Sequence, residues 1–172
     1  MKRYDIINKL IEKNNYKTYL EIGTQKNATY NKISIEKTSV DPDPKAGATH
    51  QITSDAFFSK IKSSTKYDII FVDGDHTHQQ AYRDITNSLN HLNENGTIVV
   101  HDSNPQSYEA QLVPRVQRCW NGDVWKAIVQ LRTERDDLEV NTVNSDEGCC
   151  IIKRGKGTLL KDIKLEIICK IH

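Results

Sequence analysis

Acidic and histidine side chains recur in this chain of 172 residues directly after short apolar runs. An Asp-Gly-Asp-His run that begins at Asp73 and ends at His76 follows one apolar run, and His101 and Asp102 follow the next. Carboxylates held this close repel one another and shift their pKa values unless a proton, a cation or a metal ion lies between them. If the two runs are neighbouring strands, these four side chains predict a general base or a divalent-ion site.

A second group of strand ends has the residue types that bind a nucleoside. Glu21 precedes Gly23 by two residues, and Asp41 follows the next apolar run. An acid about 20 residues beyond a glycine turn is placed to bind the two ribose hydroxyls of a nucleoside. Asp41 also stands before a proline, and an aspartate that merely shapes a turn would look the same.

The glycine turn favours one cofactor over another. The pyrophosphate of NAD needs close backbone approach at two glycines, and residues 21–28 contain only Gly23. S-adenosylmethionine (SAM) has no phosphate, and the ammonium of its amino-acid tail is a natural partner for the carboxylate of Glu21. The turn therefore suits SAM better than NAD.

A third strand end carries Ser54 and Asp55 after a short segment at 50–53. Ser54 is a common helix N-cap residue and Asp55 suits the first turn of a helix, so both have a purely structural interpretation. In a SAM site the loop at this place contacts adenine, which is the second interpretation. The agreement with the neighbouring strand ends keeps both interpretations open.

Only a parallel sheet would bring these polar ends together. Apolar periodicity predicts strands that alternate with helices, and a hairpin near the end of the chain. We expect strands at 17–22, 34–40, 50–53, 67–72, 97–100, 138–143 and 149–153, and helices at 4–14, 27–33, 54–62, 77–92 and 121–132. This alternation is typical of an α/β sheet that is parallel except at one late strand. Ligands bind at the carboxyl ends of such strands.

Composition limits the class of protein. A chain of this length fits one domain, and its net charge of +1 gives no electrostatic argument for nucleic acid as a partner. No window approaches about 18 uninterrupted apolar residues, and no signal-peptide pattern is present, so we expect a cytoplasmic protein without a membrane span. Cys149 and Cys150 should be reduced and should point to opposite faces of one strand. We expect one domain over 1–155 and an extension of uncertain structure over 156–172.

Six segments of the chain together carry a resemblance to a known family. They are Tyr19–Thr24, Ser39–Pro44, Thr53–Phe58, Tyr67–His76, Asn95–Pro105 and Trp120–Ile128. In this order they are similar to the class I SAM-dependent methyltransferases of the methyltransferase-24 family. The resemblance implies an α/β, Rossmann-like, seven-stranded sheet of order 3-2-1-4-5-7-6, with strand 7 antiparallel and helices on both faces.

The resemblance also implies an activity and a set of cofactor contacts. The activity is that of a SAM-dependent methyltransferase (EC 2.1.1.-), which O-methylates a small molecule or a sugar acceptor such as a polysaccharide precursor. The implied contacts with SAM are Glu21, Gly23, Thr24, Asp41, Ser54, Asp55 and Asp73.

The acceptor side of the implied site has two chemical alternatives. Related sugar O-methyltransferases, and catechol O-methyltransferase more distantly, bind magnesium with an Asp at the position of Asp73 and an Asp-Asp or Asp-Asn pair after strand 5. Here that pair is Asp102-Ser103, and serine is a poor substitute for a carboxylate ligand. One alternative is a magnesium ion on Asp73 and Asp102. The other is His101 or His76 as the base that deprotonates the acceptor.

Other functions are compatible with the same residues. A Rossmann-like protein that binds SAM or S-adenosylhomocysteine (SAH) without catalysis would keep the cofactor side, and a nucleotide-dependent oxidoreductase would need more glycines after Glu21. Because the loops are short, a second copy of the chain in a homodimer could complete the acceptor pocket. Trp120 is compatible with sugar stacking or with the core, whereas Trp125 is expected in the core.

Overall fold

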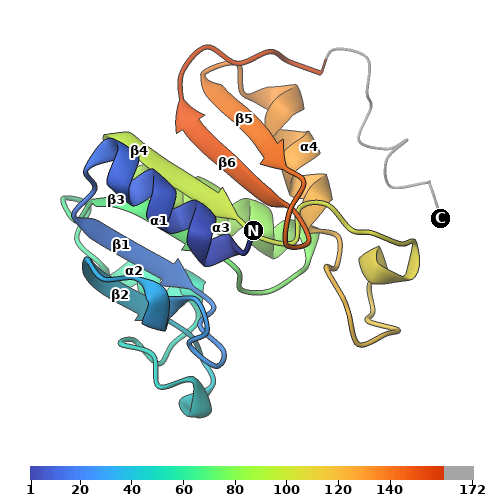
Figure 1. Ribbon diagram of the computed structural model, residues 1–172, viewed down its shortest axis with the longest axis horizontal. Helices are drawn as coiled ribbons and strands as arrows, with labels where there is room; N and C mark the ends of the chain where they lie inside the picture. Colours follow the sequence, from blue (N-terminus) through green and yellow to red (C-terminus); the bar gives the residue numbers. More distant parts are fainter. Residues whose placement is uncertain (161–172) are drawn as a thin grey trace.

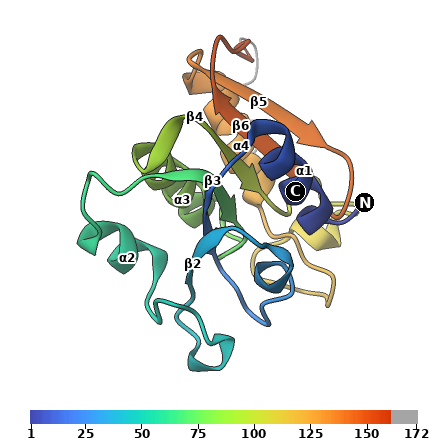
Figure 2. The same cartoon turned by 60° about the vertical axis from the view of Figure 1, so that its left-hand side comes forward.

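The computed structural model describes residues 1–160, and its centre is one mixed sheet with helices on both faces (Figures 1 and 2). The strands are β1 (Thr18–Ile22), β2 (Glu36–Val40), β3 (Tyr67–Val72), β4 (Leu92–Val100), β5 (Leu138–Val143) and β6 (Cys149–Arg154). The helices are α1 (Arg3–Asn14), α2 (Ser54–Lys60), α3 (His78–Asn90) and α4 (Val124–Glu134). None of these helices is long and apolar enough to cross a membrane. Residues 161–172, most of the expected extension, lie outside the described residues.

The strand order in the sheet is β2-β1-β3-β4-β6-β5. Strands β1 to β4 run parallel, and β6 runs antiparallel to both β4 and β5. The expected count of seven strands is not confirmed, because the described part of the chain forms six. Residues 50–53 make only an isolated parallel bridge, between His50 and Val40. Thr53, the last residue of this segment, is the N-cap of α2, so the chain turns into the helix soon after the bridge.

The N-cap of helix α2 lies one residue earlier than expected. Its N-cap is Thr53, not Ser54, and the Thr53 hydroxyl accepts a hydrogen bond from the backbone N–H of Ala56 at 3.3 Å. The Ser54 hydroxyl is thereby free to accept a hydrogen bond from Nε2 of Gln80 on α3, at 3.2 Å. The helix expected at 27–33 is reduced to turns and a single 3₁₀ turn over Tyr30–Lys32.

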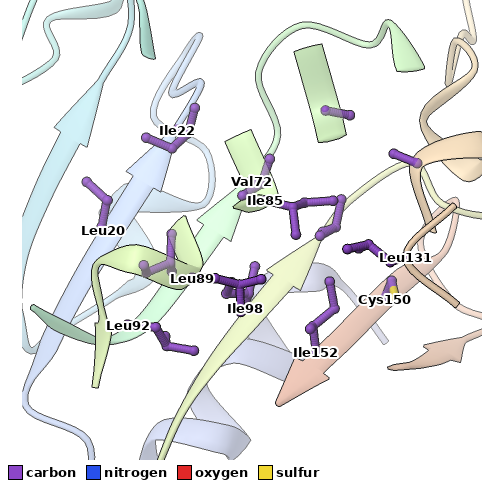
Figure 3. Close-up of a cluster of buried hydrophobic side chains, with 14 of the residues drawn as sticks. Leu20, Ile22, Val72, Ile85, Leu89, Leu92, Ile98, Leu131, Cys150 and Ile152 are labelled. Atoms are coloured by element: carbon purple, nitrogen blue, oxygen red, sulfur yellow. The ribbon is translucent and has the colours of Figure 1, made fainter. Parts of the chain in front are cut away.

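Two apolar layers hold the sheet between the helices. On one face, α3 contributes Ala81, Ile85 and Leu89 at helical spacing to a cluster that also contains residues of β1, β3, β4, β6 and α4 (Figure 3). On the other face, Ile7 and Ile11 of α1 belong to a second cluster, and Figure 2 shows α1 and α3 on opposite sides of the sheet. Full burial of each large apolar side chain stabilises the fold by about 1.5–3 kcal/mol. The strand ends at the edge of the sheet are therefore held by two packed apolar clusters.

The cysteines of β6 alternate between these layers, as expected. Cys149 belongs to the cluster under α1 and Cys150 to the cluster under α3, and both are free thiols. Burial raises the pKa of each thiol to about 12. Neither is a reactive thiolate at neutral pH, so both act as small apolar core residues.

Candidate active site

A cavity of about 560 Å³ opens at the carboxyl ends of β1, β2, β3 and β4. Its volume falls within the range of about 300–1,000 Å³ that is common for small-molecule sites. Its wall contains all of the residues that the sequence indicated. They are Glu21, Gly23, Thr24, Asp41, Ser54, Asp55, Asp73, His76, His101 and Asp102.

The turn after β1 passes close to the end of β3, which explains the glycine at position 23. Gly23 has a φ of +83°, and a Cβ there would collide with the backbone carbonyl of Asp73. Its N–H donates to the carbonyl of Val40 at 2.8 Å, so the turn is also joined to β2. The hydroxyl of Thr24 is buried on the cavity wall and has no hydrogen-bond partner within residues 1–160. A buried hydroxyl without a protein partner is satisfied by a water molecule or by a ligand atom.

Asp41 shapes the loop from which it faces the cavity. Its Oδ2 accepts hydrogen bonds from the backbone N–H groups of Thr24 (3.0 Å) and Gln25 (2.8 Å). Its Oδ1 accepts one from the N–H of Asp43 at 2.9 Å. An ionised carboxylate has about four lone-pair sites, so one remains for a hydroxyl group. The turn-forming interpretation of Asp41 is confirmed, and its contact with a ribose stays a prediction.

Glu21 lies on the cavity wall but is almost fully buried, with 1% of its surface exposed. It accepts a hydrogen bond from the hydroxyl of Tyr19, two residues earlier on β1. Burial raises the pKa of Glu21 to about 8, although the hydrogen bond from Tyr19 acts in the opposite direction. Glu21 is therefore mainly protonated at pH 7, and a cation placed beside it would favour loss of that proton.

The start of α2 forms another part of the cavity wall. The side chain of Asp55 is 52% exposed and lies 3.7 Å from Nε of Arg83. Nε2 of Gln80 lies 3.2 Å from the Ser54 hydroxyl, 3.2 Å from Asp55 Oδ1 and 3.0 Å from Asp84 Oδ1. Burial raises the pKa of Asp84 to about 6. A polar network therefore stands at this end, where the sequence indicated only Ser54 and Asp55.

Asp84 and Arg3 line the cavity although the sequence did not indicate them. Asp84 had a detectable signal, because it is an acid between Ala81 and Ile85 on the buried face of α3. Arg3 had none, because it is the first residue of an ordinary amphipathic helix. It reaches the cavity only because α1 packs across the sheet.

Asp73 and Asp102 share two imidazole neighbours at the ends of β3 and β4. Nδ1 of His101 lies 3.0 Å from Asp102 Oδ2 and 3.3 Å from Asp73 Oδ1. Nε2 of His76 lies 3.3 Å from Asp102 Oδ2 and 3.7 Å from Asp73 Oδ1. The four side chains that the sequence placed on neighbouring strand ends therefore form one cluster.

His101 is enclosed, with 5% of its side chain exposed. Its Nδ1 contacts Asp73 and Asp102 as ion pairs that lack an aligned hydrogen bond, and its Nε2 lies 3.2 Å from Nη1 of Arg3. Burial lowers the pKa of His101, but the two carboxylates outweigh burial and raise the pKa to about 10. A ring that is this enclosed and that keeps its proton at neutral pH is poorly suited to general-base chemistry.

His76 is more accessible and has a defined tautomer. Its Nδ1 lies 3.2 Å from the carbonyl oxygen of Trp120, which can only accept, so Nδ1 carries a proton. The imidazole also stacks on the Trp120 ring, with centroids 5.2 Å apart and an interplanar angle of 19°. Burial lowers the pKa of His76, but Asp73 and Asp102 raise it above the usual value. Nε2 is left facing the two carboxylates on the cavity wall.

The donor set around Asp73 does not match the preference of magnesium. Oxygen atoms of Asp73 and Asp102 and a nitrogen of His76 all lie within 4.8 Å of one another. Magnesium prefers oxygen ligands in a near-octahedral arrangement, and here a nitrogen completes the set. Ser103 lines a separate cavity, and Arg3 and His101 already place positive charge beside the carboxylates. Magnesium therefore does not fit these residues as they are arranged.

Comparison with known proteins finds a related family. The sequence profile of a family described as a methyltransferase domain matches residues 13–103, which is more than half of the chain. No curated protein matches the sequence.

Solved structures share the fold of this chain. A protein of Staphylococcus aureus assigned as a caffeoyl-CoA O-methyltransferase is 19% identical, with a TM-score of 0.67 over 88% of this chain and 82% of that chain. An SAH-bound O-methyltransferase of Bacillus cereus is 11% identical, with a TM-score of 0.69 over 89% and 80%. An SAH-bound methyltransferase of Podospora anserina is 17% identical, with a TM-score of 0.65 over 90% and 78%. At these identities the likeness shows a common α/β, Rossmann-like fold.

Proposed function

Because this chain belongs to the methyltransferase-domain family, the methyltransferase-24 group of class I SAM-dependent enzymes, we propose that it transfers the methyl group of SAM to a hydroxyl group of a small molecule. The observation that carries the proposal is the position of His76. Its Nε2 faces Asp73 and Asp102 on the wall of the same cavity that holds the glycine turn. The proposed base and the glycine turn thus share one cavity.

The cofactor side of the cavity fits SAM. The Thr24 hydroxyl is a buried polar atom without a partner in the described chain, and Asp41 keeps a lone pair for a ribose hydroxyl. Glu21 offers a buried carboxyl to the ammonium of the amino-acid tail. The polar residues at the start of α2, Ser54 and Asp55, then border the part of the cavity that is left for adenine.

The chemical task of the chain is to hold an acceptor hydroxyl and to remove its proton. When bound, SAM supplies an activated methyl group, which leaves sulfur as the acceptor oxygen bonds to it. We assign the released proton to Nε2 of His76, because Nδ1 is already directed to the carbonyl of Trp120. Asp102, 3.3 Å from Nε2, stabilises the imidazolium that results. His101 is enclosed and keeps its proton at neutral pH, so we assign it the positioning of Asp73 and Asp102, not the role of base.

Several features support a small hydroxylated acceptor, with sugars and polysaccharide precursors included. The cavity has the size of a small-molecule site, and the net charge of +1 gives no attraction for a polyanion. A hydroxyl group needs a base near neutral pH, and the imidazole of His76 on the cavity wall can serve as one.

Ligand binding followed by turnover tests the function. We expect calorimetry to detect SAH binding and not NAD binding, and mass spectrometry to detect methyl transfer to at least one member of a panel of sugars, nucleotide sugars and phenols. SAH binding without transfer to any member of the panel would favour a binding protein without catalysis. Binding of NAD in place of SAH would favour an oxidoreductase and would contradict the proposal.

Turnover is expected to persist without a divalent metal ion. The carboxylates of Asp73 and Asp102 are already paired with imidazoles, and the donor set does not match magnesium. The measurement is the rate of methyl transfer after dialysis against EDTA, with and without added magnesium. We expect the two rates to agree within about twofold, which corresponds to a difference of about 0.4 kcal/mol in activation free energy. A large loss on chelation that magnesium restores would show that the metal-free assignment is wrong.

A further inference from the structure

Arg3 brings a cation from the N-terminal helix to the cavity wall. It is the first residue of α1, which lies on the face of the sheet opposite α3 (Figures 1 and 2). Its side chain is 28% exposed, and it borders the same cavity as Glu21 and Asp73. The chemistry proposed above assigns no role to this residue.

The three nitrogens of the Arg3 guanidinium have unequal surroundings. Nε donates a hydrogen bond to the Thr29 hydroxyl at 3.1 Å, and it lies 3.7 Å from Asp73 Oδ2. Nη1 donates to Asp146 Oδ2 at 3.1 Å and lies 3.2 Å from His101 Nε2. Nη2 makes no hydrogen bond or ion pair with any residue from 1 to 160. Two N–H donors of a half-buried cation are therefore left unused.

The guanidinium is held in place before any ligand arrives. Asp146, whose side chain is only 6% exposed, accepts hydrogen bonds from the backbone N–H of Arg3 (3.0 Å) and from Nζ of Lys2 (2.8 Å). These contacts join the start of α1 to the turn between β5 and β6. A planar guanidinium fixed by such contacts loses little conformational entropy when it forms further hydrogen bonds.

The neighbourhood of Arg3 matches both charges of an α-amino acid. The positive charge of Arg3 acts to lower the pKa of Glu21, and both residues border one cavity. A carboxylate prefers an arginine, and an ammonium prefers a carboxylate. We propose that Arg3 binds the carboxylate of the amino-acid tail of SAM through Nη2, while Glu21 faces the ammonium of the same tail. This inference rests on the proposed function.

Ion pairing with Asp73 alone does not account for Arg3. The distance of 3.7 Å between Nε and Asp73 Oδ2 is beyond a hydrogen bond, and two imidazoles already pair with that carboxylate. Asp146 likewise forms an ion pair with Lys2. The remaining donors of the guanidinium are therefore available to an anionic ligand.

Two ligands that differ only in the tail test the inference by calorimetry. SAH has the amino-acid tail, and 5′-methylthioadenosine lacks it. We expect Arg3→Ala to weaken SAH binding by at least about tenfold, because a charge-assisted hydrogen bond is lost, and to change 5′-methylthioadenosine binding by less than about twofold. Lys13→Ala is the matched control, since Lys13 is an exposed cation on the same helix and lies outside the cavity. It should leave both affinities unchanged.

The outcomes separate the possible roles of Arg3. Equal weakening of both ligands, or no weakening of either, would overturn the inference, because a structural role acts on the whole cavity. If Arg3→Ala does not fold, Arg3→Lys supports the same comparison, since lysine keeps the charge but lacks Nη2; selective loss of SAH affinity is again the expected result. Failure of the unmodified protein to bind either ligand would instead contradict the proposed function.

Discussion

Replacement of His76 by alanine is expected to lower kcat for methyl transfer by roughly a hundred- to ten-thousandfold, the usual contribution of a positioned general base. The physical reason is the geometry of the ring, whose Nδ1 is directed to the carbonyl of Trp120 and whose Nε2 faces Asp73 and Asp102. SAH affinity should change little, because no cofactor contact is assigned to His76. Calorimetry and single-turnover kinetics on the same preparation measure the two quantities.

His78→Ala is the matched control for this substitution. His78 stands two residues later, at the start of α3, and its Nε2 lies 2.8 Å from Gln130 Oε1, outside the cavity. Its removal should leave kcat within about twofold. Retention of full turnover by His76→Ala, with SAH affinity intact, would show that another group removes the proton.

Replacement of Glu21 by glutamine is expected to abolish a proton release that accompanies cofactor binding. Burial raises the pKa of Glu21 to about 8, so the free protein holds this proton at pH 7. The ammonium of the cofactor tail favours the ionised form, so SAH binding should release up to about one proton per site. Calorimetry in buffers of different ionisation enthalpy measures that number. In Glu21→Gln it should fall to near zero, and SAH affinity should fall by at least about tenfold.

The same group makes the stability of the ligand-free protein depend on pH. Between the ordinary glutamate pKa of 4.5 and the folded value of about 8, the folded state binds more protons than the unfolded state. Stability therefore falls as pH rises through this window, by an amount on the order of a few kcal/mol when complete. Thermal unfolding should show that Glu21→Gln is more stable than the unmodified protein at pH 9, with a smaller difference at pH 5. Glu36→Gln, at an exposed position on β2, should show no such pattern.

The strands and their polar ends could be predicted from the sequence, because both depend on the types of neighbouring residues along the chain. An apolar run long enough to cross the sheet, followed by acids and glycine, identifies both the strand and the place where it stops. This was sufficient for the groups around Glu21, Asp73 and Asp102, all of which reach one cavity. The alternation of Cys149 and Cys150 between the two apolar layers followed in the same way from the pleat of a strand.

Predictions that depend on how elements compete for the same stretch of chain were less successful. The seventh strand was not found because Thr53 serves as the N-cap of α2, so the chain turns into the helix soon after the bridge at His50. The choice of Thr53 over Ser54 as the cap was equally undetermined, since both residues are good caps. Only the backbone conformation distinguishes them.

The acidic and histidine residues at the strand ends, and the class of ligand that they suit, were determined by the sequence itself, because residue type and spacing along a strand are local properties. Their division of labour was decided by the tertiary structure. His101 and His76 are equivalent in the sequence, yet one is enclosed by Arg3 and two carboxylates and the other faces the cavity. Arg3 enters the site only through the packing of α1 across the sheet. Burial and charge pairing arise from long-range contacts, and these contacts set the protonation states on which the chemistry depends.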